Sequence, residues 1–282
     1  MNNNIGSRVI NLFGPNIIIV AAYFSLLVIL FMTYGVKFEL SHFKLWSIFL
    51  STLLVIYITS TLIQHARRDE NLEISFLEFA FRKLVRFFFD WFPLIALVTI
   101  YENLREYTGI IRTDSIDAAL YKLDLMIFGV EPTVWIQKFA HPLLTEYFAF
   151  TYTLYLILPL SLGWLLYVCG RRKEFQNLVT AVIICLCTGF LLYLLFPAGP
   201  PRFFIADIYD PPTLQGAFGY YNAMQARFDA VNPMTYKASF PSLHVALSSL
   251  ALIYIMKFKT SVPFGKLIQF IYTILVVSLW TA

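Results

Sequence analysis

A serine and a histidine stand at the expected start of an apolar helix late in the chain. Pro241 and Ser242 precede a long apolar run, and His244 follows two residues after the serine. Serine and proline before an apolar run predict a helix start, where free N–H groups and the helix dipole attract anions. At neutral pH an imidazole can act as a general acid, a general base or a nucleophile. A helical histidine is otherwise most often a packed residue, but this context predicts a phosphate site at Ser242 with a proton donor, His244.

A second candidate, Arg202, lies in the stretch FPAGPPRFF just past another apolar run. Its three prolines and its glycine end the preceding helix and stiffen the turn. A guanidinium held by a stiff turn can bind phosphate oxygens through two parallel hydrogen bonds. The alternative is an interfacial arginine that reaches lipid headgroups. Because Arg202 and His244 fall at the ends of consecutive helices, on the same expected face of the membrane, we expect them to share one site.

The elements that must position these residues are long apolar runs. Of the 282 residues, 59% are hydrophobic and 13% are charged, whereas a soluble domain is about half apolar and about a quarter charged. A soluble protein cannot bury so many long apolar runs, so we predict an all-α, polytopic membrane bundle of about six to seven transmembrane helices. It would form a single membrane domain over residues 1–282. The expected spanning runs are residues 16–36, 45–64, 84–101, 146–168, 175–196, 241–257 and 267–282.

Basic residues are concentrated in alternate loops, which predicts that these loops are cytoplasmic. They are Arg67, Arg68, Arg82 and Lys83, then Arg171, Arg172 and Lys173, then Lys257, Lys259 and Lys266. Segments 102–145 and 197–240 would then lie outside, so the candidate site would be on the extracytoplasmic face, periplasmic or lumenal. The net charge of +4 therefore reflects topology, and no nucleic-acid partner is expected.

Segment 114–145 mixes charged residues with aromatic and aliphatic ones. This composition is typical of an amphipathic segment that lies at the membrane interface. Gly129 and Pro132 predict a turn within it. Inside the third apolar run, Arg86 and Asp90 stand four residues apart, and we expect them to pair with each other as a structural element.

No metal site and no cofactor are expected from the remaining polar residues. The three cysteines lie in or beside apolar runs, without metal-ligand spacing around them. The three other histidines, His141 among them, have no partners at a telling spacing and are assigned no role.

Together these motifs resemble the type-2 phosphatidic acid phosphatase superfamily and, within it, the branch of inositol phosphorylceramide synthases. The second signature of the superfamily is Pro-Ser-Gly-His, and here it is Pro-Ser-Leu-His, residues 241–244. Leucine at the third position is similar to the synthase branch, as are the stretch LDLMIFGVEPTVWIQ (123–137) and the FPAGPPRFF turn. The resemblance covers roughly residues 85–282, whereas the helices in residues 1–84 carry no matching motif.

The resemblance implies metal-independent phosphoryl transfer on a membrane lipid phosphate, with an alcohol or water as acceptor and no cofactor. In this family one histidine attacks phosphorus and forms a phosphohistidine, a second protonates the leaving oxygen, and an aspartate orients the nucleophile. His244 matches the acid, and Ser242 matches a phosphate-binding position. Arg202 corresponds only loosely to the first signature, because the usual Lys-x6-Arg-Pro spacing is absent.

The third signature, which supplies the nucleophilic histidine and an aspartate four residues later, does not follow His244 in this sequence. We therefore expect that the sequence stops just before the nucleophile and that it is inactive as it stands. For the whole protein, a transferase similar to inositol phosphorylceramide synthase is favoured, with a lipid phosphate phosphatase as the alternative. From other classes, a catalytically inactive membrane scaffold or a transporter remains open. A transporter predicts ionisable residues at mid-membrane depth, whereas Arg86 and Asp90 lie near one end of their run.

Overall fold

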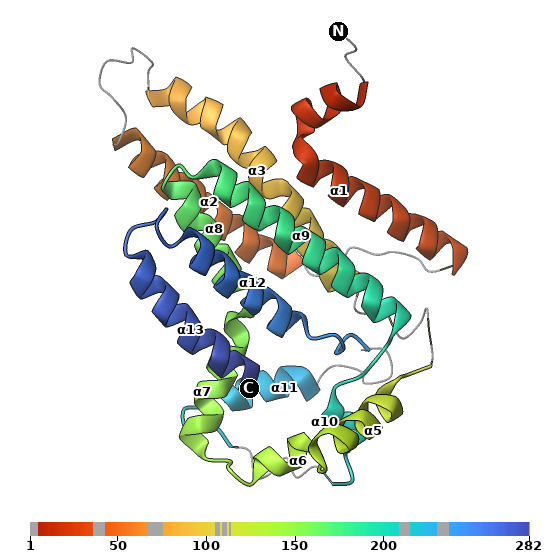
Figure 1. The fold of residues 1–282 in the computed structure, drawn as a ribbon. Coiled ribbons are helices and arrows are strands. Elements are labelled where there is room, and N and C mark those ends of the chain that lie inside the picture. The colour runs from red at the N-terminus through yellow and green to blue at the C-terminus, as the bar shows by residue number, and fades with distance from the viewer. Residues whose placement is uncertain are drawn as a thin grey trace. The chain divides into compact units, whose positions relative to one another are not determined.

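The computed structural model describes residues 5–35, 43–66, 76–104, 108, 112, 114–208, 215–229 and 237–281. Within these ranges every named element is a helix, which confirms the all-α fold (Figure 1). Arg67 and Arg68, expected in the first cytoplasmic loop, lie outside the described residues. Arg82 and Lys83, expected in the same loop, lie within the helix Phe76–Leu104, so that part of the expectation is wrong.

Six of the seven expected apolar runs form single helices. They are α1 (Ile5–Thr33), α2 (Phe43–Ala66), α3 (Phe76–Leu104), α9 (Arg172–Leu195), α12 (Leu243–Phe258) and α13 (Gly265–Thr281). Among the described residues, Pro15–Thr33 and Arg172–Leu195 are long and apolar enough to cross a membrane, and a bent helix pair could supply a third span. Shorter apolar helices cover Leu54–Ile63, Leu243–Phe258 and Gly265–Thr281.

The seventh run, residues 146–168, is not one helix, so that expectation is wrong. It forms α7 (Pro142–Tyr152), a 3-10 turn η1 (Thr153–Tyr155) and α8 (Ile157–Val168). Pro159 explains the break, because it has no N–H to donate to the carbonyl of Tyr155 and its ring clashes with that carbonyl in a continuous helix. The interruption places Tyr152 and Tyr155 at a helix end, where the candidate site uses them.

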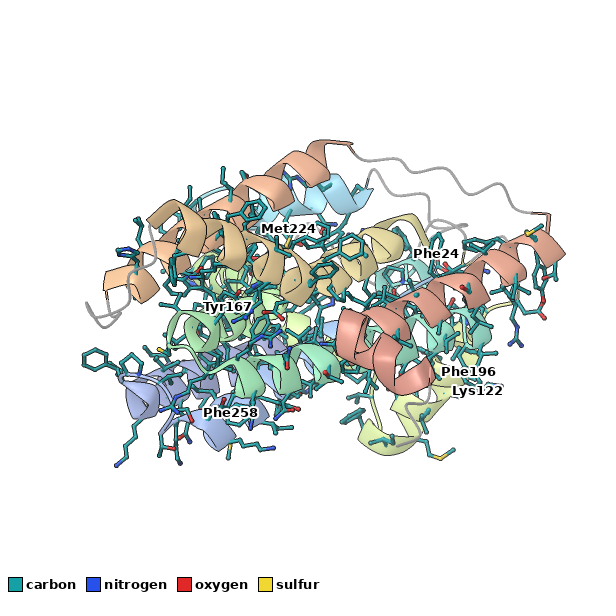
Figure 2. All side chains as sticks on the ribbon, turned by 90° about the horizontal axis from the view of Figure 1, so that it is seen from above. Phe24, Lys122, Tyr167, Phe196, Met224 and Phe258 are labelled. Atoms are coloured by element: carbon teal, nitrogen blue, oxygen red, sulfur yellow. The ribbon has the colours of Figure 1, made fainter. Side chains whose placement is uncertain are left out.

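The chain divides into two compact units, each assembled from segments that are distant in sequence. The first unit contains the described residues of Met1–Asn103, Pro159–Cys187 and Ile253–Gln269. Its core includes the fully buried side chains of Trp91, Leu97, Leu166 and Phe175. Large apolar side chains also lie on the outside of its helices, such as Phe24 on α1, which is 43% exposed (Figure 2). Such an apolar exterior is expected of helices that face lipid.

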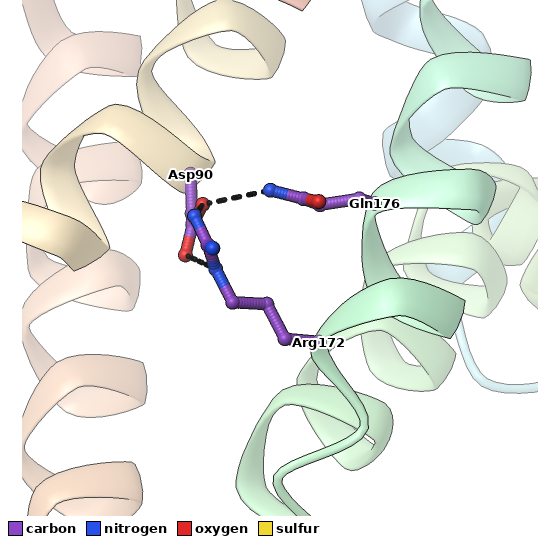
Figure 3. A network of polar contacts seen from close by, with 3 residues as sticks. All are labelled: Asp90, Arg172 and Gln176. Atoms are coloured by element: carbon purple, nitrogen blue, oxygen red, sulfur yellow. Dashed lines mark hydrogen bonds and ion pairs between the residues drawn. The ribbon is translucent and has the colours of Figure 1, made fainter. Parts of the chain in front are cut away.

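One polar network in the first unit corrects an expectation from the sequence. Asp90 accepts hydrogen bonds from Nε and Nη2 of Arg172, at 3.1 and 2.7 Å, and from Gln176 at 3.4 Å (Figure 3). The expected partner, Arg86, is exposed instead. Asp90 is buried, and its carboxylate is directed at the first turn of α9. The packing of α3 against α9, and not the spacing along α3, therefore selects the partner.

The second unit contains the described residues of Leu104–Leu158, Thr188–Leu252 and Phe270–Ala282. Short helices dominate it: α5 (Asp117–Phe128), α6 (Pro132–Gln137), α7, α10 (Pro201–Phe204) and α11 (Tyr220–Asp229). The turn expected in segment 114–145 is confirmed. Gly129 ends α5 in the left-handed conformation, with φ of 71°, and donates its N–H to Leu125. Glu131 then caps α6 by accepting from the N–H of Val134 at 3.0 Å.

Candidate active site

A short backbone pairing in the second unit brings the turn after α9 beside the segment that enters α12. Ala198 donates its N–H to Lys237 at 3.3 Å, and its carbonyl accepts from Ser239 at 3.0 Å. The two residues Ala198 and Ala238 form a parallel bridge and are both buried. The Arg202 turn and the Ser242–His244 helix start are thus tied together by backbone hydrogen bonds, although they are 40 residues apart in sequence.

The start of α5 holds the same turn from another direction. Asp117 accepts a hydrogen bond from the N–H of Gly199 at 2.9 Å, and Ile116 donates its N–H to the carbonyl of Pro197 at 3.0 Å. Arg112 donates to the carbonyl of Leu195 at the end of α9. These contacts satisfy backbone groups that a proline-rich turn leaves without helical partners. The turn therefore has a defined shape from which Arg202 projects.

The ring of His244 packs against two tyrosines from the break between α7 and α8. The centroid of its ring lies 4.2 Å from that of Tyr152, with an interplanar angle of 20°, and 3.9 Å from that of Tyr155. The preceding residue, Leu243, is buried, so the helix start is anchored in the core on one side. The imidazole is therefore held by the rings of α7 and η1, and it is only partly exposed.

Ser242 sits at the N-cap position of α12. Its Oγ accepts a hydrogen bond from the N–H of Val245 at 3.4 Å, and its carbonyl accepts from Ala246 at 3.1 Å. A serine in this position is a preferred N-cap. The helix start expected at this serine is confirmed, and His244 is the second residue of the helix.

A cavity of about 470 Å³ lies within the second unit and is lined by Arg202, Ser242 and His244 together. Polar side chains from α6, α7 and α11 also reach it, including Gln137, Thr145 and Gln225. Much of the remaining wall is apolar, from residues Ile136, Phe139, Leu144, Phe148, Met224 and Phe228. A cationic end beside an apolar wall matches an amphiphilic anion such as a lipid phosphate.

A match to a protein family covers this whole cavity. The family model described as the PAP2 superfamily matches residues 118–282, more than half of the chain. The chain belongs to the PAP2 superfamily. Comparisons with curated proteins and with solved structures gave no match. PAP2 superfamily membership supports a phosphatase- or phosphotransferase-type function on lipid phosphates, and with the apolar helices it indicates a membrane protein.

The three residues singled out in the sequence of this PAP2 protein all line one cavity, but the sequence missed several of their neighbours. Tyr152 and Tyr155 stand about ninety positions before His244 and carry no motif. His141, which was assigned no role, also lines the cavity.

Helix α11 is a further element of the cavity wall that the sequence did not predict. It is anchored by Glu146 of α7, a buried residue whose carboxylate accepts the N–H groups of Tyr220 at 2.6 Å and Tyr221 at 3.4 Å. A carboxylate at a helix start satisfies free N–H groups and interacts favourably with the helix dipole. Gly216 passes so close to Glu146 that a Cβ at this position would collide with the carboxylate. The sequence could not show this contact, because Glu146 and its partners on α11 are about seventy residues apart.

Proposed function

We propose that this protein is an integral-membrane lipid phosphotransferase whose active site is the cavity lined by Arg202, Ser242 and His244. The observation that carries the proposal is the convergence of these three residues on one cavity that also has an extended apolar wall. A guanidinium and a helix start both favour a phosphate group. An imidazole beside them supplies the proton that a leaving oxygen needs.

In the proposed reaction, Arg202 and the N-cap region at Ser242 bind the phosphate oxygens and stabilise the charge that develops on them. His244 donates a proton to the leaving oxygen as the bond from phosphorus to that oxygen breaks. The positive charge that neutralises the phosphate comes from the protein's own groups. We therefore propose that the reaction does not depend on a divalent metal. As the family resemblance implies, a second histidine bonds to phosphorus as the leaving oxygen departs and so forms a phosphohistidine. The acceptor hydroxyl then attacks that phosphorus, the phosphorus–nitrogen bond breaks, and the hydroxyl proton returns to His244.

Transfer to an alcohol is favoured over hydrolysis by the likeness of the 241–244 signature and of the 123–137 stretch to inositol phosphorylceramide synthases. A transferase must keep water away from its reacting groups while it admits an alcohol. The tyrosine rings packed on His244, at 4.2 and 3.9 Å, support such shielding. We further propose a multi-pass arrangement with six or seven spans and the site on the extracytoplasmic face, because clusters of basic residues alternate along the sequence with the segments that build the cavity.

The test is an assay of the purified full-length protein, with the third signature included, in liposomes that contain an inositol phospholipid as donor and ceramide as acceptor. Liposomes that contain phosphatidic acid alone are assayed beside them. We expect headgroup transfer to ceramide, unaffected by EDTA. Release of inorganic phosphate without transfer would instead identify a lipid phosphatase. The absence of both from folded protein would favour an inactive scaffold or a transporter.

The matched variants are His244→Ala and His65→Ala. The first should abolish turnover while the protein remains folded, because the proposed proton donor is lost. The second removes a histidine of the first unit, outside the cavity, and should leave turnover unchanged. Full activity in His244→Ala, or inhibition by EDTA that a divalent ion reverses, would contradict the assigned chemistry.

A further inference from the structure

The guanidinium of Arg202 is held by contacts from α10 and α11. Its carbon Cζ lies 4.7 Å from the ring centroid of Phe203 and 5.4 Å from that of Phe228. Its Nη1 forms an ion pair with Oδ1 of Asp229 at 3.4 Å. The side chain of Arg202 is only 17% exposed, although it lines the cavity. A long arginine side chain has many rotamers in solution, and these contacts restrict them.

The carboxylate of Asp229 is itself oriented by a residue of the cavity wall. Gln225, one helical turn earlier on α11, donates from Nε2 to the same Oδ1 of Asp229 at 3.2 Å. Asp229 is 60% exposed, so burial does not fix its side chain. The hydrogen bond from Gln225 gives that carboxylate oxygen a preferred position, in reach of the Arg202 guanidinium.

The start of α11 is fixed as well, by the two hydrogen bonds from its first N–H groups to the buried Glu146. The helix therefore runs from a buried anchor at Glu146 to the carboxylate that contacts Arg202. An anchored helix that ends at the cavity's cation can set the position of that cation.

We propose that Asp229 is a positioning residue that holds the Arg202 guanidinium in the orientation that binds the substrate phosphate. This inference rests on the proposed function of Arg202. The contact uses one terminal nitrogen of a group with five N–H donors, so a second edge can bind a phosphate. An exposed carboxylate pairs only weakly with a guanidinium, and it therefore biases the orientation of Arg202 without preventing a doubly charged phosphate from binding.

The experiment uses the whole protein in detergent with inorganic phosphate as the probe. The dissociation constant for phosphate is taken from the rise in the thermal unfolding temperature with phosphate concentration. Four variants form a double-mutant cycle with its control: Asp229→Ala, Arg202→Ala, the double variant, and Asp207→Ala. Asp207 is an exposed aspartate near α10 that does not line the cavity. If Asp229→Ala does not fold, Asp229→Asn replaces it, and the positioning role of Asp229 is judged by the same criteria.

We expect Asp229→Ala to weaken phosphate binding about two- to fivefold, as the loss of an exposed ion pair allows, and Asp207→Ala to have no effect. In the Arg202→Ala background, Asp229→Ala should cause no further loss, because Asp229 acts through that arginine. Unchanged binding, tighter binding, or an equal loss in both backgrounds would overturn the positioning role of Asp229 alone. Unchanged binding in Arg202→Ala, or no phosphate binding by the unaltered protein, would instead overturn the proposed phosphate site.

Discussion

The imidazole of His244 is stacked on the phenol ring of Tyr152, with ring centroids 4.2 Å apart and an interplanar angle of 20°. Such a ring contact holds the imidazole in one orientation, and aromatic pairs contribute about 0.5–1.5 kcal/mol beyond their buried area. We therefore expect Tyr152→Leu to lower turnover about two- to tenfold. The measurement is the rate of lipid phosphate turnover by equal amounts of folded full-length protein.

Tyr152→Phe is the matched control for this prediction. It keeps the ring and removes only the hydroxyl, so it should retain most of the turnover. If the leucine and phenylalanine variants lose activity equally, the hydroxyl of Tyr152 and not its ring contact with His244 would be the important feature.

Gly189 on α9 lies directly against the residue that precedes His244. A Cβ at this position would stand 2.5 Å from Cδ2 of Leu243 and 2.9 Å from its Cγ. Leu243 is buried and has little room to move, so Gly189→Ala should destabilise the protein by about 1–3 kcal/mol. It should also lower turnover, because a shift of Leu243 moves the start of α12. Thermal unfolding and the turnover assay together check both effects.

Gly163 on α8 offers the opposite case. A Cβ there would meet its three nearest atoms at 3.6–3.8 Å, which is ordinary van der Waals contact. Gly163→Ala should therefore be neutral or slightly stabilising, because alanine also favours the helix.

Combining Gly189→Ala with Leu243→Ala should recover part of the turnover that Gly189→Ala loses. No recovery would indicate that the collision with Leu243 is not the cause.

The sequence predicts most of this fold because a long apolar run forms a helix through contacts between residues that are close in sequence. Six of the seven expected runs form single helices, and Ser242, His244 and Arg202 line one cavity. The break before α8 was also readable, since Pro159 cannot donate to the carbonyl of Tyr155. The sequence does not show which distant residue will pair with a buried polar group. Asp90 has a charged residue one turn away, yet it pairs with another 82 positions along the chain.

The pair between Asp90 and Arg172 yields a stability prediction for the first unit. The Asp90 side chain is 3% exposed, whereas that of Arg172 is 50% exposed. Removing one partner of a buried pair leaves an uncompensated charge. Since only Asp90 is deeply buried, Arg172→Ala should cost about 2–3 kcal/mol and Asp90→Asn clearly less, because the amide oxygen keeps a hydrogen bond. Unfolding in detergent measures both.

Arg86→Ala serves as the control for this pair. Arg86 is exposed and lies one turn from Asp90 on α3, so its loss should change the stability by about 0.5 kcal/mol or less. A loss as large as that of Arg172→Ala would mean that Arg86 is the partner of Asp90 after all.

The carboxylate of Glu146 leads to a prediction about local stability within the second unit. It is buried and accepts two N–H groups at the start of α11, and hydrogen bonds to charged groups contribute about 1.5–3 kcal/mol. Glu146→Ala should therefore speed hydrogen exchange of the amides of Tyr220 and Tyr221, and it should reduce turnover because α11 lines the cavity.

Glu146→Gln retains an acceptor oxygen and should show a smaller effect. Glu174→Ala, in the first turn of α9, should leave both amides unchanged. Equal exchange rates in Glu146→Ala and the unaltered protein would show that α11 does not depend on this carboxylate.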